Sequence, residues 1–431
     1  MTNFKPSGVD WIGDIPNNWD VTRFRHVFRE SKEVNGSSPV GEMLSVSGYK
    51  GVVPKVYESE SLKRDDDQLE TYRVVRKGQL AVNTMWLNYA GLGISEFEGH
   101  MSPAYRAYWV SNKVHGRYMH HLLRSQLYVN AYTACLTGVR PNSLQMSRDN
   151  LMSFPILLPP FEEQQAIADS LDRELERIDG LIKKQQEMVA LLEEKQRDLI
   201  EQHVSGLNSA GAIVLTNDKI WPRIAAGFEL VPLKHALAMP ITDGPHETPE
   251  FLDEGIEFIS AEAVSSGEIN FENRRGYISE LANREYSKKY SPRLHDIYMI
   301  KSGATTGRSA ILREERPFNI WSPLAVLRSM AGVNPFYLHY AVQSTSFQKS
   351  ISLAWSFGTQ QNIGMGALGQ LKIPLPALEI QNAITSSLDR SLGDLKNTIA
   401  KARDLNLVLA ERRSALISEA VTGKIDLRGK K

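Results

Sequence analysis

The chain has 431 residues and a formal net charge of zero, with 42% hydrophobic and 23% charged residues. A chain of this length is too long to fold around a single ordinary hydrophobic core, so we expect two or three globular domains. The single cysteine, Cys135, excludes an intramolecular disulfide and a cysteine-cluster metal site. No apolar run is long enough to cross a bilayer and no signal-peptide pattern opens the sequence, so we expect a cytoplasmic protein with no membrane partner.

The first segment, residues 1–160, is predicted to be a globule of mixed strands and helices. Short β-like runs such as GQLAVNTMW alternate with helical segments such as YMHHLLRSQLYVNAYTA. Two polar loops that contain glycine, residues 83–93 and 137–145, carry side chains able to read DNA bases. Their candidate DNA-binding residues are Asn83, Trp86, Asn88, Tyr89, Arg140, Asn142, Ser143 and Gln145.

The next segment, residues 161–206, predicts one long helix. A proline pair precedes it and Gly206 ends it. Apolar residues recur at steps of three and four, which is the seam of a coiled coil. The helix carries twelve acidic residues against six basic ones, so we expect that it does not lie on phosphates. The seam consists of Leu171, Leu175, Ile178, Ile182, Val189, Leu192 and Leu199, with Gln185 and Gln196 at vacant positions.

A second globule is predicted over residues 207–376, again with polar loops. Asn and Gln can pair bidentately with adenine, and Arg and Lys with guanine. For any single residue the alternative is that these types populate loops because they suit turns. The loops of the two halves fall at matching places, and this favours the interpretation that they read DNA bases. The candidate DNA-binding residues here are Asp243, His246, Thr248, Lys301, Thr305, Arg308, Gln360, Gln361 and Asn362.

Residues 377–431 repeat the long helix and add a tail. A shift of 217 residues aligns residues 156–206 with 373–423 without a gap. Because each helix must bury its apolar stripe, we expect the two copies to pair as an antiparallel coiled coil. The alternative is two separate amphipathic helices, each packed on its own domain. The second seam consists of Leu388, Leu392, Leu395, Ile399, Asn406, Leu409 and Leu416.

These elements predict an α+β fold with a pseudo-two-fold internal repeat, in which an antiparallel pair of long helices separates two globules. No motif for catalysis accompanies it. The run SGATTGRS at residues 302–309 lacks the spacing and the lysine of a phosphate-binding loop, since Arg308 follows its second glycine. Dinucleotide, nucleophile-elbow, zinc-protease and amino-methyltransferase motifs are also missing. We therefore expect a binding protein with no catalytic residue and no metal site.

Several stretches together resemble the specificity subunits of type I restriction-modification enzymes. They are the repeated LPPFEEQQAIADSLDRELERIDGLI and LPALEIQNAITSSLD, the helix endings LIEQHVSG and RRSALISEAVTGKIDL, the opening GVDWIGDIPNNWDV, and the loop TDGPHETP. The resemblance extends over nearly the whole chain. It is strong in the repeated helices and weak in the globules.

The resemblance implies that each globule is a target recognition domain that reads one half of a split double-stranded DNA sequence. The helices would space the two domains and dock two modification subunits, which bind S-adenosylmethionine and methylate adenine in defence against phage. Restriction subunits, which use ATP and Mg²⁺, could join. On this interpretation the chain itself binds no cofactor. The alternatives are a protein–protein adaptor without DNA specificity and, least favoured, a self-sufficient nuclease.

Overall fold

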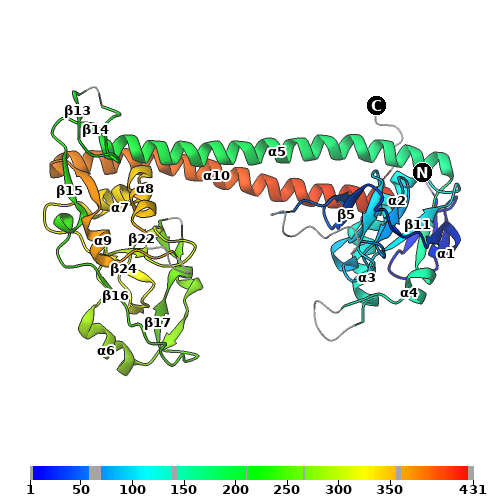
Figure 1. Cartoon of the computed structure of the whole chain (residues 1–431), viewed down its shortest axis with the longest axis horizontal. Helices are drawn as coiled ribbons and strands as arrows, with labels where there is room; N and C mark the ends of the chain where they lie inside the picture. The colour runs from blue at the N-terminus through cyan, green and yellow to red at the C-terminus, as the bar shows by residue number, and fades with distance from the viewer. Residues whose placement is uncertain are drawn as a thin grey trace. The chain divides into compact units, whose positions relative to one another are not determined.

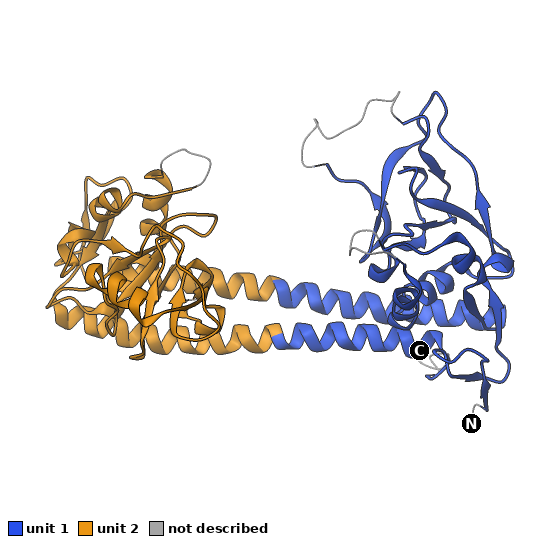
Figure 2. Ribbon diagram, turned by 90° about the horizontal axis from the view of Figure 1, so that it is seen from below, with its two compact units in different colours: residues 1–186, 404–431 blue, residues 187–403 orange. Residues whose placement is uncertain are grey.

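The computed structural model describes residues 3–57, 69–137, 144–209, 211–265, 267–355 and 361–425. The chain forms two compact units, residues 1–186 with 404–431 and residues 187–403, which Figure 2 colours separately. Each unit contains β-sheets, short helices, and a segment of both long helices, α5 (Phe161–Ser205) and α10 (Leu378–Val421) (Figure 1). The predicted α+β class is confirmed. The predicted domain limits divide the chain differently, because they assign each long helix to a segment of its own, and they stay a prediction.

Two four-stranded sheets form the globule of the first unit. One has the order β6-β5-β10-β7 and the other the order β4-β11-β8-β9. The strands are β4 (Phe28–Ser31), β5 (Glu42–Ser47), β6 (Gly51–Pro54), β7 (Arg73–Val75), β8 (Leu80–Val82), β9 (Leu92–Ile94), β10 (Gly99–Met101) and β11 (Arg106–Val110), with pairs β1 (Phe4–Pro6) and β2 (Asp14–Pro16), and β3 (Asp20–Arg23) and β12 (Pro155–Leu158). The helices are α1 (Phe24–Val27), η3 (Leu87–Tyr89), α2 (Gly116–Arg124), α3 (Gln126–Cys135) and α4 (Arg148–Ser153).

The second unit repeats this plan. Its main sheets have the orders β16-β24-β21-β22 and β20-β17-β23, and β17 runs parallel to β23 as β5 runs parallel to β10. The strands are β16 (Thr242–Asp243), β17 (Ile256–Ile259), β20 (Gly276–Ile278), β21 (Ile297–Ile300), β22 (Ser309–Ile311), β23 (Phe318–Ile320) and β24 (Leu324–Leu327), with pairs β13 (Ile213–Leu215) and β14 (Arg223–Ala225), β15 (Glu229–Pro232) and β25 (Lys372–Leu375), and β18 (Val264–Ser265) and β19 (Glu268–Ile269). The helices are η5 (Leu233–Ala236), η6 (Ala261–Ala263), η7 (Phe271–Asn273), α6 (Glu280–Lys289), α7 (Pro335–Gln343), α8 (Thr345–Leu353) and α9 (Met365–Gln370).

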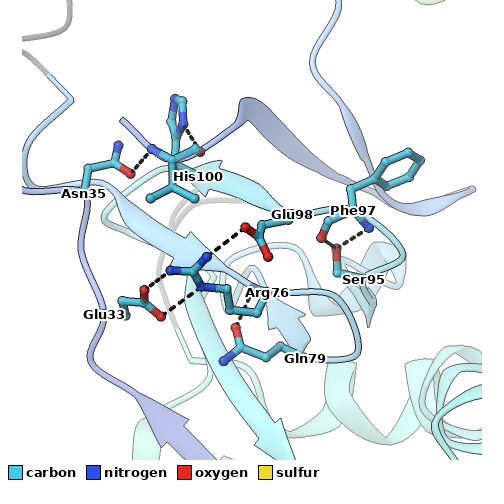
Figure 3. Close-up of polar contacts among 9 residues, drawn as sticks. Glu33, Asn35, Arg76, Gln79, Ser95, Phe97, Glu98 and His100 are labelled. Carbon is cyan, nitrogen blue, oxygen red and sulfur yellow. Dashed lines mark hydrogen bonds and ion pairs between the residues drawn. The ribbon is translucent and has the colours of Figure 1, made fainter. Parts of the chain in front are cut away.

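A polar cluster links strands of the first globule (Figure 3). The Arg76 guanidinium pairs with both carboxylate oxygens of Glu33 and, at 2.8 Å, with Oε1 of Glu98. The backbone N–H of Arg76 also donates to Oε1 of Gln79 at 2.9 Å. Because the charges of this cluster satisfy one another, it ties the β7–β8 turn to the chain that follows β4 and to the residue before β10, and it is not a candidate binding site.

A buried glutamine fixes the start of each long helix in the same way. Gln164 Nε2 donates to the Pro159 carbonyl at 2.8 Å, and its Oε1 accepts the backbone N–H of His115 at 2.8 Å. Gln381, which lies 217 residues later, makes the same two bonds, with the Pro376 carbonyl and the N–H of Asn334, both at 2.8 Å. The sequence repeat is therefore also a repeat of buried hydrogen bonds.

The ends of the long helices also match. Tyr337 of α7 donates its hydroxyl to the carbonyl of Val204 near the end of α5, and Tyr118 of α2 donates to Val421 near the end of α10. Gly206 and Gly423 follow in the left-handed conformation, both with φ of 72°. A Cβ on Gly206 would lie 2.5 Å from the Ala225 side chain, so both φ and space require glycine there.

The two long helices pack against each other with opposite directions in each unit. In the first unit the start of α5 shares a core with the end of α10, and Arg413 pairs with Asp179 at 2.8 Å. In the second unit the end of α5 shares a core with the start of α10, and Arg403 pairs with Glu193 at 2.6 Å. These contacts confirm the antiparallel pairing and exclude two separately packed helices.

The predicted seam is buried or half-buried along both helices. Leu171, Leu175, Ile178, Leu388, Leu392, Ile399 and Leu409 are buried, and Ile182, Val189, Leu192, Leu199, Leu395, Asn406 and Leu416 are half-buried. Towards the helix ends the most buried position moves by one residue, to Ile200 beside Leu199 and to Ile417 beside Leu416. A helix of 3.6 residues per turn drifts against a seven-residue repeat, which accounts for this difference.

Candidate nucleic-acid interface

In the first unit the two predicted recognition loops meet. Backbone bonds between Thr137 and Gln145 close the second loop at its base. The N–H of Met146 donates to the Thr84 carbonyl at 3.2 Å, and Gln145 Nε2 donates to Thr84 Oγ1 at 3.5 Å, which joins this base to the first loop. Gln145 is exposed beside the junction. Arg140, Asn142 and Ser143, predicted on the same loop, lie outside the described residues.

An exposed aromatic pair lies on the first loop. Trp86 is 53% exposed and Tyr89 is 62% exposed, with ring centroids 5.7 Å apart. Asn88 lies between them, half-buried, and its Oδ1 has no hydrogen-bond partner among the described residues. Large aromatic side chains that are exposed in this way suit stacking on a base or insertion at a base step.

Asn83 differs from the other predicted residues of this loop. Its side chain is 3% exposed, and its Oδ1 accepts the backbone N–H of Met85 at 3.2 Å. The N–H of Asn83 donates to the Gly91 carbonyl at 2.8 Å, which closes the loop. Asn83 therefore shapes the loop from within, and its predicted contact with DNA stays a prediction.

Arg124, at the end of α2, holds the same loop from below and was not predicted. Its Nη1 donates to the carbonyls of Leu92 at 2.6 Å, Ala90 at 2.8 Å and Ser47 at 3.3 Å, and its Nη2 donates to Gly48 at 2.8 Å. Burial lowers the pKa of this guanidinium to about 10. Arg124 is thus a half-buried cation whose partners are backbone carbonyls of two loops.

The recognition loops of the second unit meet through the same backbone contact. The N–H of Ile363 donates to the Lys301 carbonyl at 2.9 Å, as Met146 does to Thr84, and Ser302 forms a bridge with Asn362. The N–H of Gly303 donates to the carbonyl of Gln361 at 2.9 Å. The predicted residue Gln360 lies outside the described residues. Two loops predicted separately thus form one composite surface in each unit.

Several predicted residues of the second unit form an ion cluster. Asp243 is fully buried, and its carboxylate contacts Lys289 at 2.5 Å, His246 at 3.1 Å and Lys301 at 3.3 Å. Burial alone would raise the pKa of Asp243, but the hydrogen bonds and charges of the two lysines hold it below its usual value. Asp243 therefore acts as a structural anchor in this unit, and its predicted contact with DNA stays a prediction.

Most of the other predicted residues of the second unit lie on the exposed side of this composite surface. His246, Thr248, Arg308, Gln361 and Asn362 are exposed, and Thr305 is half-buried with its carbonyl accepting the N–H of Arg308 at 3.1 Å. Only Lys301, whose side chain is 12% exposed, turns largely inward to Asp243.

Neither metal binding nor membrane insertion finds support in the described chain. It contains no group of three or more histidine, cysteine or acidic residues arranged to hold a metal ion. No helix in the described ranges is both long and apolar enough to cross a membrane.

Comparison with known proteins shows what the chain is similar to. Residues 248–403 match the family model described as the type I restriction modification DNA specificity domain. A chain solved in work on complex assembly and conformational transition of the type I R-M system superposes with a TM-score of 0.65 at 18% identity, covering 95% of this chain and 99% of that one, and supports the fold.

Curated relatives bear the same family name. The type I restriction enzyme EcoBI specificity subunit of Escherichia coli is 24% identical over 290 residues, 65% of this chain, and the StySPI specificity subunit of Salmonella potsdam is 26% identical over 142 residues, 32% of this chain. The chain spans 59% and 30% of the lengths of these two relatives. The resemblance to type I restriction-modification specificity subunits is confirmed, and residues 248–403 are similar to the DNA specificity domain of these proteins.

Proposed function

We propose that the chain is the non-catalytic DNA specificity subunit of a type I restriction-modification complex and recognises a bipartite, asymmetric duplex sequence. The observation that carries this proposal is the composite loop surface, which recurs in both units on the same backbone contact, Met146 to Thr84 and Ile363 to Lys301. A repeated scaffold that presents different side chains is what reading two different half-sites requires.

The two loop surfaces differ in chemistry. The first unit presents Trp86 and Tyr89 beside Gln145, and the second presents His246, Arg308 and Gln361. An aromatic pair recognises a base-pair step by stacking on the bases and by deforming the duplex. Arginine and glutamine instead recognise base edges through hydrogen bonds. Each half-site would therefore be recognised by its own mechanism.

Partners follow from the proposal. Each unit contains one segment of α5 and one of α10 in equivalent packing, which supports two equivalent docking surfaces for two modification subunits. S-adenosylmethionine would be bound by those subunits. Two restriction subunits could join with ATP and Mg²⁺, and the complex would act in the cytoplasm in phage defence.

Mapping of methylated adenines tests the proposal. Genomes of cells that express the modification subunit with and without this chain are compared, and methylation at one split sequence is expected only with the chain present. A protein–protein adaptor would leave the methylation pattern unchanged, and the purified chain would show neither salt-dependent nor sequence-dependent duplex binding.

The same map tests the spacer role suggested by the sequence. Inserting one heptad into α5 and one into α10 lengthens both helices by about 10 Å at 1.5 Å per residue. The gap between the half-sites should widen by about three base pairs at 3.4 Å each. A gap that stays unchanged while methylation persists would show that the helices do not set the spacing.

A further inference from the structure

A cleft of about 700 Å³ lies in the second unit between the globule and the long helices. The globule contributes residues from α7, α8 and the start of β22, while α5 and α10 form the opposite wall. Arg308, which belongs to the composite loop surface, lies at its lining. The cleft therefore continues from the candidate base-reading loop towards the helices.

Positive charge exceeds negative charge in this cleft. Five basic and two acidic side chains line it. Glu193 pairs with Arg403 at 2.6 Å, and Glu268 lies 3.9 Å from Arg313. The other three cations, Arg197 of α5, Lys396 of α10 and Arg308, are exposed and make no ion pair with any carboxylate of the described chain. Three cations, from α5, α10 and the loop before β22, thus line one cleft without a counterion in the described chain.

Two residues that line the cleft also have buried polar atoms without partners among the described residues. Ser309, which is 5% exposed, lines it, and its Oγ has no hydrogen-bond partner among the described residues. Gln196 also lines the cleft, and its buried Nε2 has no hydrogen-bond partner among the described residues. A buried donor left unpaired costs about 1–3 kcal/mol, so both atoms favour an acceptor that enters from the cleft.

We propose that this cleft binds phosphate groups of the DNA backbone that flank the half-site read by the second unit. Cations without counterions and buried donors match the oxygens of a phosphodiester. Arg197 and Lys396 then give the long helices direct contacts with DNA, beyond their roles in spacing and docking. The inference rests on the proposed function. It differs from the expectation based on the acidic composition of α5, because the charge at the cleft and not the charge of the whole helix would meet the phosphate.

The salt dependence of duplex binding by the full chain tests the proposal. The variant Arg197→Gln with Lys396→Gln is compared with Lys195→Gln and Lys401→Gln, which remove two exposed cations from the same helices outside the cleft. The plot of log K against log salt has a negative slope, and each lost phosphate contact reduces the magnitude of this slope by about 0.9. We expect a decrease of about 1.8 for the cleft variant, equal for specific and nonspecific duplexes, and a wild-type slope for the control.

A second variant separates charge from folding. Glu268→Gln removes an acidic group from the cleft and leaves Arg313 without its counterion, so binding should tighten and the slope should increase, which misfolding cannot produce. Equal slopes for the cleft variant and its control, or no effect of Glu268→Gln, would overturn the inference while wild-type binding upholds the proposed function. Absence of any duplex binding by the wild type in complex with its modification subunit would overturn both.

Discussion

The two units share a backbone plan but differ in the cleft between globule and helices. The cleft of the first unit, about 730 Å³, is lined by four basic and four acidic side chains, whereas five basic and two acidic ones line that of the second. At positions 217 residues apart, the Asp179–Arg413 pair of the first unit corresponds to Lys396 and Gln196 of the second. The two halves therefore share their packing but differ in the charges that line the cleft. The two clefts would bind a common ligand with different strength.

The largest expected effect concerns the support of the recognition loops. Arg124→Leu leaves four carbonyls of the first unit without this donor. Since each buried unpaired group costs about 1–3 kcal/mol, we expect a loss of at least about 4 kcal/mol in unfolding free energy. Recognition of the half-site read by the first unit should weaken, with the other half-site unaffected. Denaturant unfolding and binding to duplexes mutated in one half measure both effects.

Gln348 offers the matched comparison in the second unit. Its Nε2 donates to the carbonyls of Gly307 at 2.9 Å and Val342 at 2.6 Å. Gln348→Leu should impair the other half-site and destabilise less, because it frees two carbonyls instead of four. Equal loss at both half-sites for either variant would contradict this assignment.

Acid should destabilise both units through an equivalent histidine. Burial lowers the pKa of His339 to about 3, and burial likewise lowers the pKa of His120 on α2. The unfolded chain, with a histidine pKa near 6.5, takes up protons that the folded chain excludes, so stability is full above pH 6.5 and falls below it. For His339 the loss is about 2 kcal/mol at pH 5.

His339→Gln and His120→Gln separate the two contributions. Each variant should show a smaller decrease in Tm between pH 7.5 and pH 5 than the wild type, and the double variant the smallest. A decrease as large as that of the wild type in the double variant would assign the acid sensitivity to other groups.

The buried glutamines test whether the two copies of the repeat contribute equally to the free energy of unfolding. Gln164→Ala and Gln381→Ala each remove two hydrogen bonds at the start of a long helix, and each should cost about 2 kcal/mol at about 1 kcal/mol per bond. Denaturant unfolding should give similar losses for the two. A much larger loss at one position would show that the two helix starts contribute unequally to stability.

The sequence predicts best the features that depend on local pattern. The long helices, their proline and glycine ends and their pairing follow from periodicity and repetition. The meeting of the two loops within each unit was not predicted, because it depends on contacts between residues far apart in the sequence. The role of Arg124 depends on carbonyls contributed by residues 47, 48, 90 and 92, which no local pattern brings together. For the same reason, residue type alone assigned the buried Asn83 and Asp243 to the DNA-binding surface.

The smallest expected effect comes from transplanting the charge pair. Gln196→Arg with Lys396→Asp installs in the second unit the pair that Asp179 and Arg413 form at 2.8 Å in the first. An exposed pair of this kind contributes at most about 1 kcal/mol to stability, so the fold should be unchanged. The new arginine would be neutralised by the new aspartate, so the cleft loses one free cation.

The slope of log K against log salt should then fall by about 0.9, half the effect of removing both Arg197 and Lys396. The reverse exchange in the first unit, Asp179→Lys with Arg413→Gln, should raise the slope only if phosphate also passes that cleft. Comparison of the two exchanges thus shows whether DNA contacts both units alike or is held mainly by the second. A wild-type slope after the first exchange would mean that Lys396 does not meet phosphate.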